Sequence, residues 1–141
     1  MISGLLVLPQ EKGQTIRLEN NFEEVEKLLK GKAFRLATKQ DNIAIYYNPD
    51  FQPISSCKYM NQFYTFSGKI DSILCGPILI LKEIEPYKNF CDLSLDEIKD
   101  FTEQYGRPKT FSYDRSKRIL TGKDMISQVK TMISCWLENE D

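Results

Sequence analysis

The first half of the chain carries short apolar runs separated by turn-forming residues. Residues 4–9 (GLLVLP) form a continuous apolar run that proline ends, and residues 15–19 (TIRLE) alternate apolar and polar side chains. Two such runs on either side of the polar turn EKG predict a β-hairpin. Residues 33–37 (AFRLA) and 43–47 (IAIYY) flank the turn TKQDN in the same way, and they predict a second hairpin.

Three segments carry apolar residues at helical spacing. Residues 20–31 (NNFEEVEKLLKG) begin with asparagine and two early glutamates and end in glycine, which are helix start and stop signals. In residues 94–106, Ser94 and Glu97 form a capping box before a second apolar stripe. A third helix is predicted within residues 124–137. Its apolar face consists of Ile126, Val129, Ile133, Trp136 and Leu137.

Residues 48–68 break the regular pattern, with two prolines and five aromatic residues. We expect an ordered excursion with one short strand here, because the segment is too long for a simple connection. Residues 71–74 (DSIL) and 77–84 (PILILKEI) follow, and Cys75 and Gly76 between them predict a bend or bulge before a buried strand. The order of strands and helices indicates an α+β fold, a mainly antiparallel sheet packed on one face by three helices.

The length of 141 residues and the composition fit a single domain. Hydrophobic residues make up 41% and charged residues 28%, which is too apolar for a disordered chain. We expect residues 1–106 to form the α+β part, and residues 107–141, a basic segment and the last helix, to pack on the same domain. The longest apolar run, PILIL, is too short for a membrane span, and the start of the chain lacks secretory-signal features. We therefore predict a cytoplasmic protein.

The cysteines give little support to a metal site. Cys57, Cys75, Cys91 and Cys135 include no C-x-x-C pair, and the chain has no histidine. Structural zinc sites usually take their ligands as close pairs, so reduced, buried cysteines are favoured over a site that collects four scattered thiolates. We predict no metal and no cofactor.

Catalytic motifs are absent from the sequence. Without histidine the commonest general base is missing, and so are Ser-His and Cys-His nucleophile pairs. No phosphate-binding glycine loop, nucleophile elbow or zinc-protease motif occurs. A carboxylate acting as acid or base would be sought at Asp50, Asp71 or Asp114, whose positions favour turn or cap roles. The sequence thus favours a protein that is not an enzyme.

The order of the motifs resembles a family. It comprises an opening strand that ends in proline, a hairpin, a short acidic helix, a strand pair that leads to Asn48, and DSILCGPILIL (71–81) before FCDLSLDEIKDFTEQY. These features resemble the small proteins of a domain-of-unknown-function family found in phages, plasmids and other mobile elements of Gram-positive bacteria. The resemblance covers about residues 4–106 and concerns the fold rather than an activity. Members often have an Asn-Arg pair before the Asp-x-Ile segment, where this chain has Asn61 followed by Gln62.

Residues 107–118 (RPKTFSYDRSKR) concentrate positive charge in a chain whose formal net charge is -1. They precede the predicted third helix, whose first amides would present a positive dipole end. Cationic side chains beside such amides make an anion site, most naturally for phosphate. The predicted phosphate ligands are Arg107, Lys109, Arg115, Lys117, Arg118 and Lys123. The alternative is a solvated hairpin or arm whose charges balance the acidic remainder of the chain.

Aromatic residues near these cations could stack on a planar ligand such as a nucleobase. The predicted stacking residues are Tyr59, Phe63, Tyr64, Phe111 and Tyr113. The alternative is that the rings cover a loop or form a protein interface, because large aromatic side chains contribute buried area wherever they lie.

These features lead to a functional prediction. We expect a phage or mobile-element accessory protein that sequesters a phosphate-bearing small molecule, such as a nucleotide of host defence signalling, without transforming it. The alternative is an interaction module that inhibits or adapts a host protein, with homo-oligomers possible in either case, because aromatic residues and arginine also dominate protein interfaces. Nucleic acid is disfavoured by the isoelectric point of about 5.6.

Overall fold

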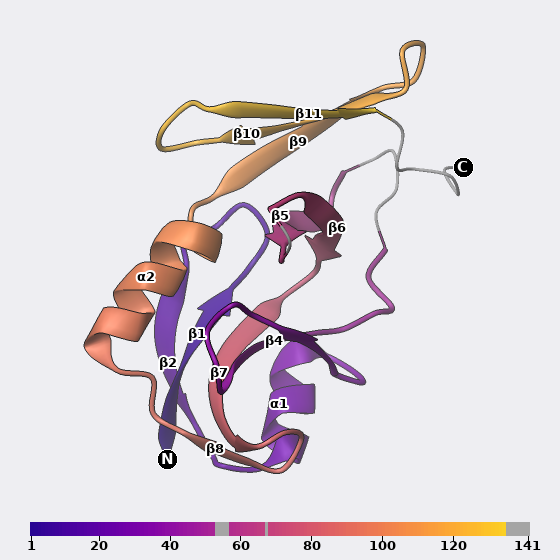
Figure 1. Ribbon diagram of the computed structural model, residues 1–141. Coiled ribbons are helices and arrows are strands. Elements are labelled where there is room, and N and C mark those ends of the chain that lie inside the picture. Colours follow the sequence, from indigo (N-terminus) through magenta and orange to yellow (C-terminus); the bar gives the residue numbers. More distant parts are fainter. Residues whose placement is uncertain (53–56, 67, 135–141) are drawn as a thin grey trace.

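The computed structural model describes residues 1–52, 57–66 and 68–134, and this part of the chain forms two helices and eleven strands (Figure 1). The helices are α1 (Phe22–Leu29) and α2 (Leu95–Tyr105). The strands are β1 (Ile2–Val7), β2 (Gln14–Leu18), β3 (Phe34–Ala37), β4 (Ile43–Tyr47), β5 (Met60–Thr65), β6 (Ile70–Cys75), β7 (Ile78–Glu85), β8 (Asn89–Cys91), β9 (Lys109–Asp114), β10 (Ile119–Asp124) and β11 (Lys130–Ser134). Within the described residues, neither helix has the length and apolar character needed to cross a membrane.

A six-stranded antiparallel sheet forms the centre of the molecule. Its strands run in the order β2-β1-β7-β4-β3, and β8 pairs with the second half of β7. The two hairpins that the sequence predicts, β1–β2 and β3–β4, are confirmed. Strand β7 joins them by pairing with β1 on one side and with β4 on the other. Residues 78–81 of β7 are all buried, as expected of a central strand covered on both faces.

The two helices lie on opposite faces of this sheet (Figure 1). Leu79 of β7 belongs to the apolar cluster that contains Val25 of α1, whereas its neighbour Ile80 belongs to the cluster that contains Phe101 of α2. Successive side chains of a strand point to opposite faces, so a continuous apolar strand needs a cover on each side. The prediction that the helices pack on one face of the sheet is therefore wrong.

The ends of the helices follow the signals in the sequence. The Asn21 side chain accepts a hydrogen bond from the Glu24 N–H at 2.8 Å, and Ser94 and Glu97 form the predicted capping box. At the other end of α1, the buried side chain of Asn48 donates to the last helical carbonyl at 3.1 Å. This asparagine therefore holds the end of α1 against the end of β4.

A partly buried ion pair lies on the α1 side of the sheet. Arg35 donates from Nε and Nη2 to the Glu83 carboxylate at 2.7–3.0 Å, and the Tyr46 hydroxyl donates to the same carboxylate. The Glu83 side chain is 3% exposed and that of Arg35 is 29% exposed. The hydrogen bond to Glu83 raises the pKa of Arg35, and burial raises the pKa of Tyr46. The carboxylate thus has the partners that a buried charge requires.

Beyond one end of the main sheet, the β5–β6 hairpin packs against a three-stranded sheet in the order β11-β10-β9 (Figure 1). Leu120 of β10 is fully buried among residues of β5 and β6. Asn61 in β5 donates its Nδ2 to the carbonyls of Val7 and Gly76 at 2.9 Å each, which ties β5 to β1 and to the β6–β7 corner. The corner itself is the predicted bend, where Gly76 has a φ of +71°.

The predicted third helix is wrong. The described part of residues 124–137 consists of a turn followed by strand β11, which pairs with β10 from residue 130 to residue 134. The α+β fold with three helices is therefore corrected to a fold of mostly antiparallel strands with two helices in the described part of the chain. Trp136 and Leu137, two members of the predicted helical face, lie outside the described residues.

Local hydrogen bonds explain why residues 124–134 do not form a helix. The Asp124 Oδ1 atom accepts the N–H groups of Ile126 and Ser127 at 2.8 and 2.9 Å, which closes a tight turn. The β-branched residues Thr131 and Ile133 then pair with β10, a setting that suits them better than a helix. Apolar residues three or four apart fit a helix, but they also fit a turn followed by a strand, and pairing with β10 decides between the two.

Candidate functional site

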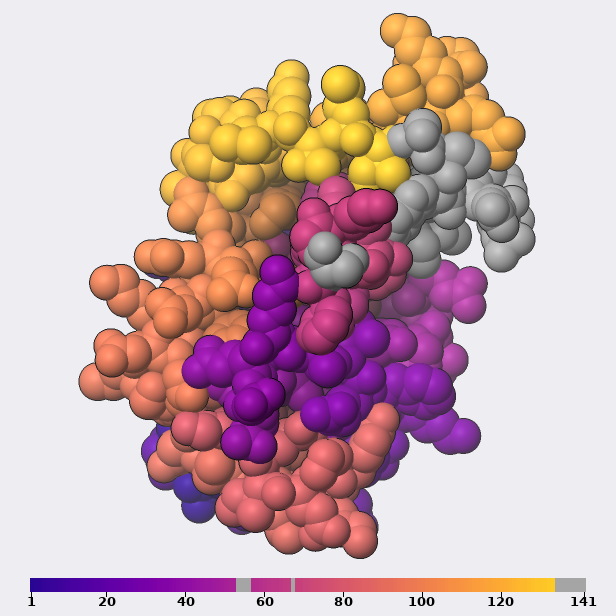
Figure 2. Space-filling view, viewed as in Figure 1, coloured from indigo at the N-terminus to yellow at the C-terminus, as the bar shows by residue number. Residues whose placement is uncertain are grey.

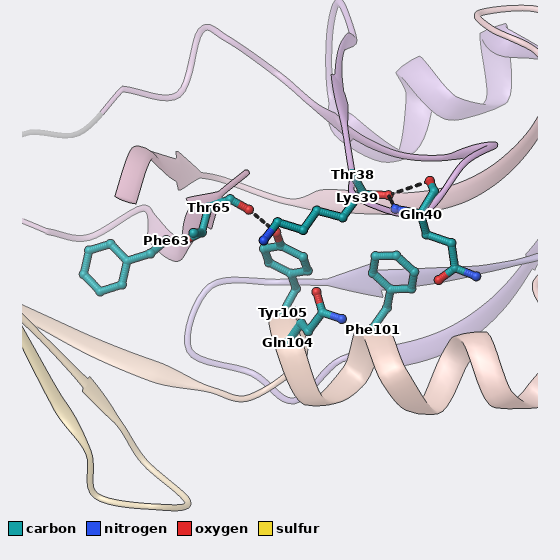
Figure 3. Close-up of a pocket in the computed structure, with 8 residues that line it drawn as sticks. All are labelled: Thr38, Lys39, Gln40, Phe63, Thr65, Phe101, Gln104 and Tyr105. Carbon is teal, nitrogen blue, oxygen red and sulfur yellow. Dashed lines mark hydrogen bonds between the residues drawn. The ribbon is translucent and has the colours of Figure 1, made fainter. Parts of the chain in front are cut away.

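A cleft of about 530 Å³ lies where the β3–β4 turn, strand β5 and the second half of α2 meet (Figure 3). Its lining residues are Thr38, Lys39 and Gln40 from the turn, Phe63 and Thr65 from β5, and Phe101, Gln104 and Tyr105 from α2. In the space-filling view of Figure 2, the purple β3–β4 turn stands out between the orange α2 and the magenta β5–β6 hairpin. Because these segments are far apart in the sequence, the cleft exists only in the folded chain.

The β3–β4 turn is held by its own hydrogen bonds. The Thr38 hydroxyl donates to the Ile43 carbonyl at 2.8 Å, and the Gln40 N–H donates to the Thr38 oxygen at 3.2 Å. The turn carries Lys39, whose side chain in Figure 3 runs over the cleft toward Tyr105. The ammonium group is therefore presented from a fixed backbone, although the side chain itself is exposed.

Aromatic rings form the floor and one end of the cleft. Phe101 and Tyr105 are one helical turn apart, with ring planes 15° apart and centroids separated by 6.4 Å. Both side chains are buried, so only a small part of each ring reaches the cleft. At the other end, Phe63 is half-buried and meets Phe111 edge to face at 5.3 Å. The Tyr105 hydroxyl donates to the Thr65 carbonyl at 3.4 Å, which links the two walls.

The lining of the cleft carries one positive charge. Lys39 is the single charged residue among the described residues that line it, and glutamine amides and threonine hydroxyls supply neutral hydrogen-bonding groups. Burial raises the pKa of Tyr105, and the nearby Tyr64 and Asp71 add to this effect, so the Tyr105 phenol is protonated at neutral pH. Such a lining suits a small molecule that combines a planar ring with an anionic group.

Two of the predicted phosphate ligands lie together at the junction of α2 and β9. Arg107 donates from Nε to Asp124 Oδ2 at 2.8 Å, and Lys109 donates from Nζ to Gln62 Oε1 at 2.7 Å. The Gln62 amide donates in turn to the Arg107 carbonyl at 2.8 Å. Burial lowers the pKa of Lys109, against the attraction of Asp124. Both cations therefore connect β9 to β5 and β10.

The other predicted phosphate ligands lie elsewhere on the three-stranded sheet. Arg115, Lys117 and Arg118 belong to the exposed turn at the tip of the β9–β10 hairpin, which projects from the molecule in Figure 1. Lys123 lies in β10. The structure thus distributes the six cations over a junction, a hairpin tip and a strand. The helix N-terminus that was expected behind them is a β-hairpin instead.

The five predicted stacking residues also have different environments. Phe63 lines the cleft. Phe111 and Tyr113 pack against the apolar cluster between the two small sheets. Tyr64 is buried, and its hydroxyl donates to a β3 carbonyl at 2.5 Å. Tyr59 is 41% exposed. One predicted residue is therefore in the cleft, and three others have packing roles.

Sequence reasoning missed most of the cleft. It interpreted residues 38–42 as a turn only and Tyr105 as part of an apolar helical stripe. Lys39 and Gln104 carried no signal of their own, because isolated polar residues in a turn and on a helix are common on any surface. Lys39 and Gln104 line the same cleft only because folding brings the β3–β4 turn next to the second half of α2.

A second hollow of about 400 Å³ lies beside β6 on the other side of the β5–β6 hairpin. Its lining residues are Leu36, Tyr47, Pro49, Phe51, Gln52, Ser72, Ile73, Leu74 and Cys75. None of these described residues carries a charge that could hold an anion at neutral pH, so the first cleft is the better candidate for a phosphate-bearing ligand.

Of the cysteines in the described part, Cys75 and Cys91 are free thiols. Cys57 and Cys75 are buried and Cys91 is half-buried, whereas Cys135 lies outside the described residues. Burial raises the pKa of Cys57 and raises that of Cys75 to about 12, with Cys57 adding to the latter effect. Both buried cysteines are therefore protonated and weakly reactive at neutral pH. Over the described residues, no group of three His, Cys, Asp or Glu side chains could hold a metal ion.

Comparison of the chain with protein-family models, with curated proteins and with solved structures gave no match in any of the three. The resemblance to a family of phage and mobile-element proteins therefore stays a prediction, and the site must be interpreted from its own residues.

Proposed function

We propose that the protein is a non-enzymatic binding protein that holds a phosphate-bearing small molecule, such as a nucleotide, in the cleft between the β3–β4 turn, β5 and α2. The observation that carries the proposal is the lining itself. It combines one cation, three aromatic rings and several amides and hydroxyls, and none of its described members is acidic.

In this proposal, Lys39 pairs with the phosphate at the rim of the cleft. Its exposed position leaves the ammonium group accessible, and a charge-assisted contact to phosphate is stronger than a neutral hydrogen bond. The amide of Gln104 and the ring of Phe63 supply polar and apolar contacts to the rest of the ligand. A volume of about 530 Å³ lies within the range of small-molecule pockets.

The lining also supports binding rather than transformation of the ligand. Its described residues include no thiol, carboxylate or imidazole, and the raised pKa of Tyr105 keeps that phenol from acting as a base at neutral pH. Sequestration of a nucleotide in the cytoplasm of a host cell, as expected for a phage or mobile-element accessory protein, needs affinity and no reaction.

Isothermal titration calorimetry with a panel of linear and cyclic nucleotides tests the proposal. We expect at least one to bind with a stoichiometry of one per chain. Lys39→Ala should weaken that binding by about 10-fold to 100-fold, because a charge-assisted contact contributes about 1.5–3 kcal/mol.

The matched control is Lys32→Ala, another exposed lysine, which follows α1 on the far side of the sheet. It should leave the affinity unchanged. The proposal fails if no nucleotide in the panel binds, or if Lys39→Ala and Lys32→Ala have the same affinity as the native protein.

A further inference from the structure

Within the described residues, strand β11 forms one edge of the three-stranded sheet. The sheet order is β11-β10-β9, and over the described residues no other strand pairs with the outer side of β11. The Asp124 N–H donates to the Val129 carbonyl at 2.9 Å, and bonded and non-bonded residue pairs alternate along an antiparallel ladder. Lys130 and Met132 therefore direct their backbone N–H and C=O groups away from β10, toward the open edge.

The two faces of this edge differ in chemistry. Leu120 and Gly122 of β10 are buried and face the β5–β6 hairpin, so their partners Ile133 and Thr131 in β11 share that inner face. Lys130 and Met132 are on the outer face, where Met132 is 73% exposed. The open edge thus presents a cation and a long apolar side chain on one face and two β-branched residues on the other.

Two lysines stand directly opposite each other on the outer face. Lys123 in β10 and Lys130 in β11 are cross-strand partners, and neither forms a salt bridge with any described residue. Like charges in this position destabilise a sheet. An anionic side chain next to Lys130 at the β11 edge would offset that repulsion, with its strongest attraction to Lys130 and a weaker one to Lys123 one strand further away.

From these features we infer that the β11 edge binds an extended acidic segment of another protein, which adds to the sheet as a fourth strand. Backbone hydrogen bonds to Lys130 and Met132 would hold the segment in register. Side chains of a strand alternate between faces, so the segment that fits has acidic residues beside Lys130 and Met132, on the face that also carries Lys123, and apolar residues beside Thr131 and Ile133. The partner is defined by this alternation of acidic and apolar residues.

Charge favours this partner over a second copy of the chain. Pairing two β11 edges would bring a second Lys123 and Lys130 onto the same sheet, which adds positive charge instead of neutralising it. A nucleic acid would satisfy the lysines but would leave the backbone groups of Lys130 and Met132 without strand partners. The inference concerns a different surface from the cleft and does not depend on its ligand.

Fluorescence anisotropy with a labelled peptide that alternates glutamate and valine tests the inference on the full chain. We expect saturable binding, at least about tenfold tighter than binding of the matched peptide that alternates lysine and valine. N-methylation of alternate residues, on the edge that faces β11, should abolish binding, and N-methylation of the intervening residues should not. Equal binding of the glutamate and lysine peptides, or insensitivity to both N-methylation patterns, would overturn the inference.

Protein variants provide an independent measurement. Lys123→Glu combined with Lys130→Glu should weaken binding of the glutamate peptide at least about tenfold and should reverse the preference between the two peptides. Lys32→Glu, on the far side of the main sheet, is the matched control and should change neither. An unchanged preference in the double variant would contradict the role given to the lysines.

Competition in the anisotropy assay and sedimentation distinguish the other possible occupants of the edge. If single-stranded oligothymidylate displaces the glutamate peptide and binds more tightly, the surface is a nucleic-acid site and the inference is wrong. If sedimentation shows a dimer that the peptide does not dissociate and that Lys130→Glu disrupts, a second copy occupies the edge and the inference is equally wrong.

Discussion

At the scale of single residues, Gly122 allows the two small sheets to approach each other closely. It faces inward from β10, and an ideal Cβ atom at this position would lie 2.5 Å from Cε2 of Phe63. The Phe63 ring cannot simply move, because Phe111 packs against it and would itself lie 3.0 Å from the added atom. The Phe63 ring thus packs between the two small sheets and also lines the cleft.

Gly122→Ala should therefore lower the free energy of unfolding by about 1–3 kcal/mol, the usual cost of overpacking. Urea denaturation followed by circular dichroism measures it. Thr121→Ala, at the adjacent outward-facing position, is the control and should change stability by less than about 0.5 kcal/mol. A Gly122→Ala variant as stable as the native protein would show that Phe63 is free to shift.

A second residue-scale prediction concerns Glu83, whose carboxylate pairs with Arg35. Glu83→Gln leaves the Arg35 guanidinium without its charged partner in a half-buried position, and we expect a loss of about 1–3 kcal/mol in the free energy of unfolding. Glu85→Gln in the same strand removes the partner of Lys88 in an exposed pair and should cost less than about 0.5 kcal/mol. Equal effects of the two substitutions in urea denaturation would contradict a special role for the partly buried pair.

At the scale of elements, the β10–β11 hairpin depends on one carboxylate. Burial opposes ionisation of Asp124, but the N–H groups of Ser127 and Ile126 and the guanidinium of Arg107 outweigh burial and lower its pKa to about 2. The same side chain thus closes the turn and anchors the hairpin to the end of α2.

This arrangement predicts a pH dependence. The folded-state pKa of Asp124 lies below the value of about 3.9 for an unfolded aspartate, so ionised Asp124 stabilises the fold above about pH 4. That contribution is lost as the pH falls through 4 toward 2. Asp124→Asn should therefore be less stable than the native protein at pH 7, by about 1–2 kcal/mol, and the difference should shrink on acidification. A difference that stays constant from pH 7 to pH 2 in urea denaturation would refute this assignment.

At the scale of the whole molecule, stability should be highest at the centre of the six-stranded sheet. Strands β1, β4 and β7 are paired on both sides and covered by apolar clusters on both faces, whereas β2, β3 and β11 are edges. Amide hydrogen exchange measured by NMR should show the slowest exchange in β7 and β4, and markedly faster exchange in β11. Protection of β11 equal to that of β7 would instead indicate that its edge is covered in solution.

Local patterns in the sequence predicted the elements whose partners are close along the chain. The β1–β2 and β3–β4 hairpins, both helix caps and the bend at Gly76 follow from turn chemistry and capping groups within a few residues. The short strand β8 was missed, because three residues carry too little periodicity to be distinguished from a loop.

The sequence by itself determined which segments are apolar, where the hairpins turn and where both helices begin. It did not determine whether residues 124–134 form a helix or a strand, because their apolar spacing fits both and pairing with β10 decided it. The cleft, too, was decided by tertiary structure, since Lys39, Phe63 and Gln104 come together only when the turn, β5 and α2 pack around the central sheet. Turns and caps form from neighbouring residues, whereas strand pairing and clefts depend on contacts between residues that are distant in the chain.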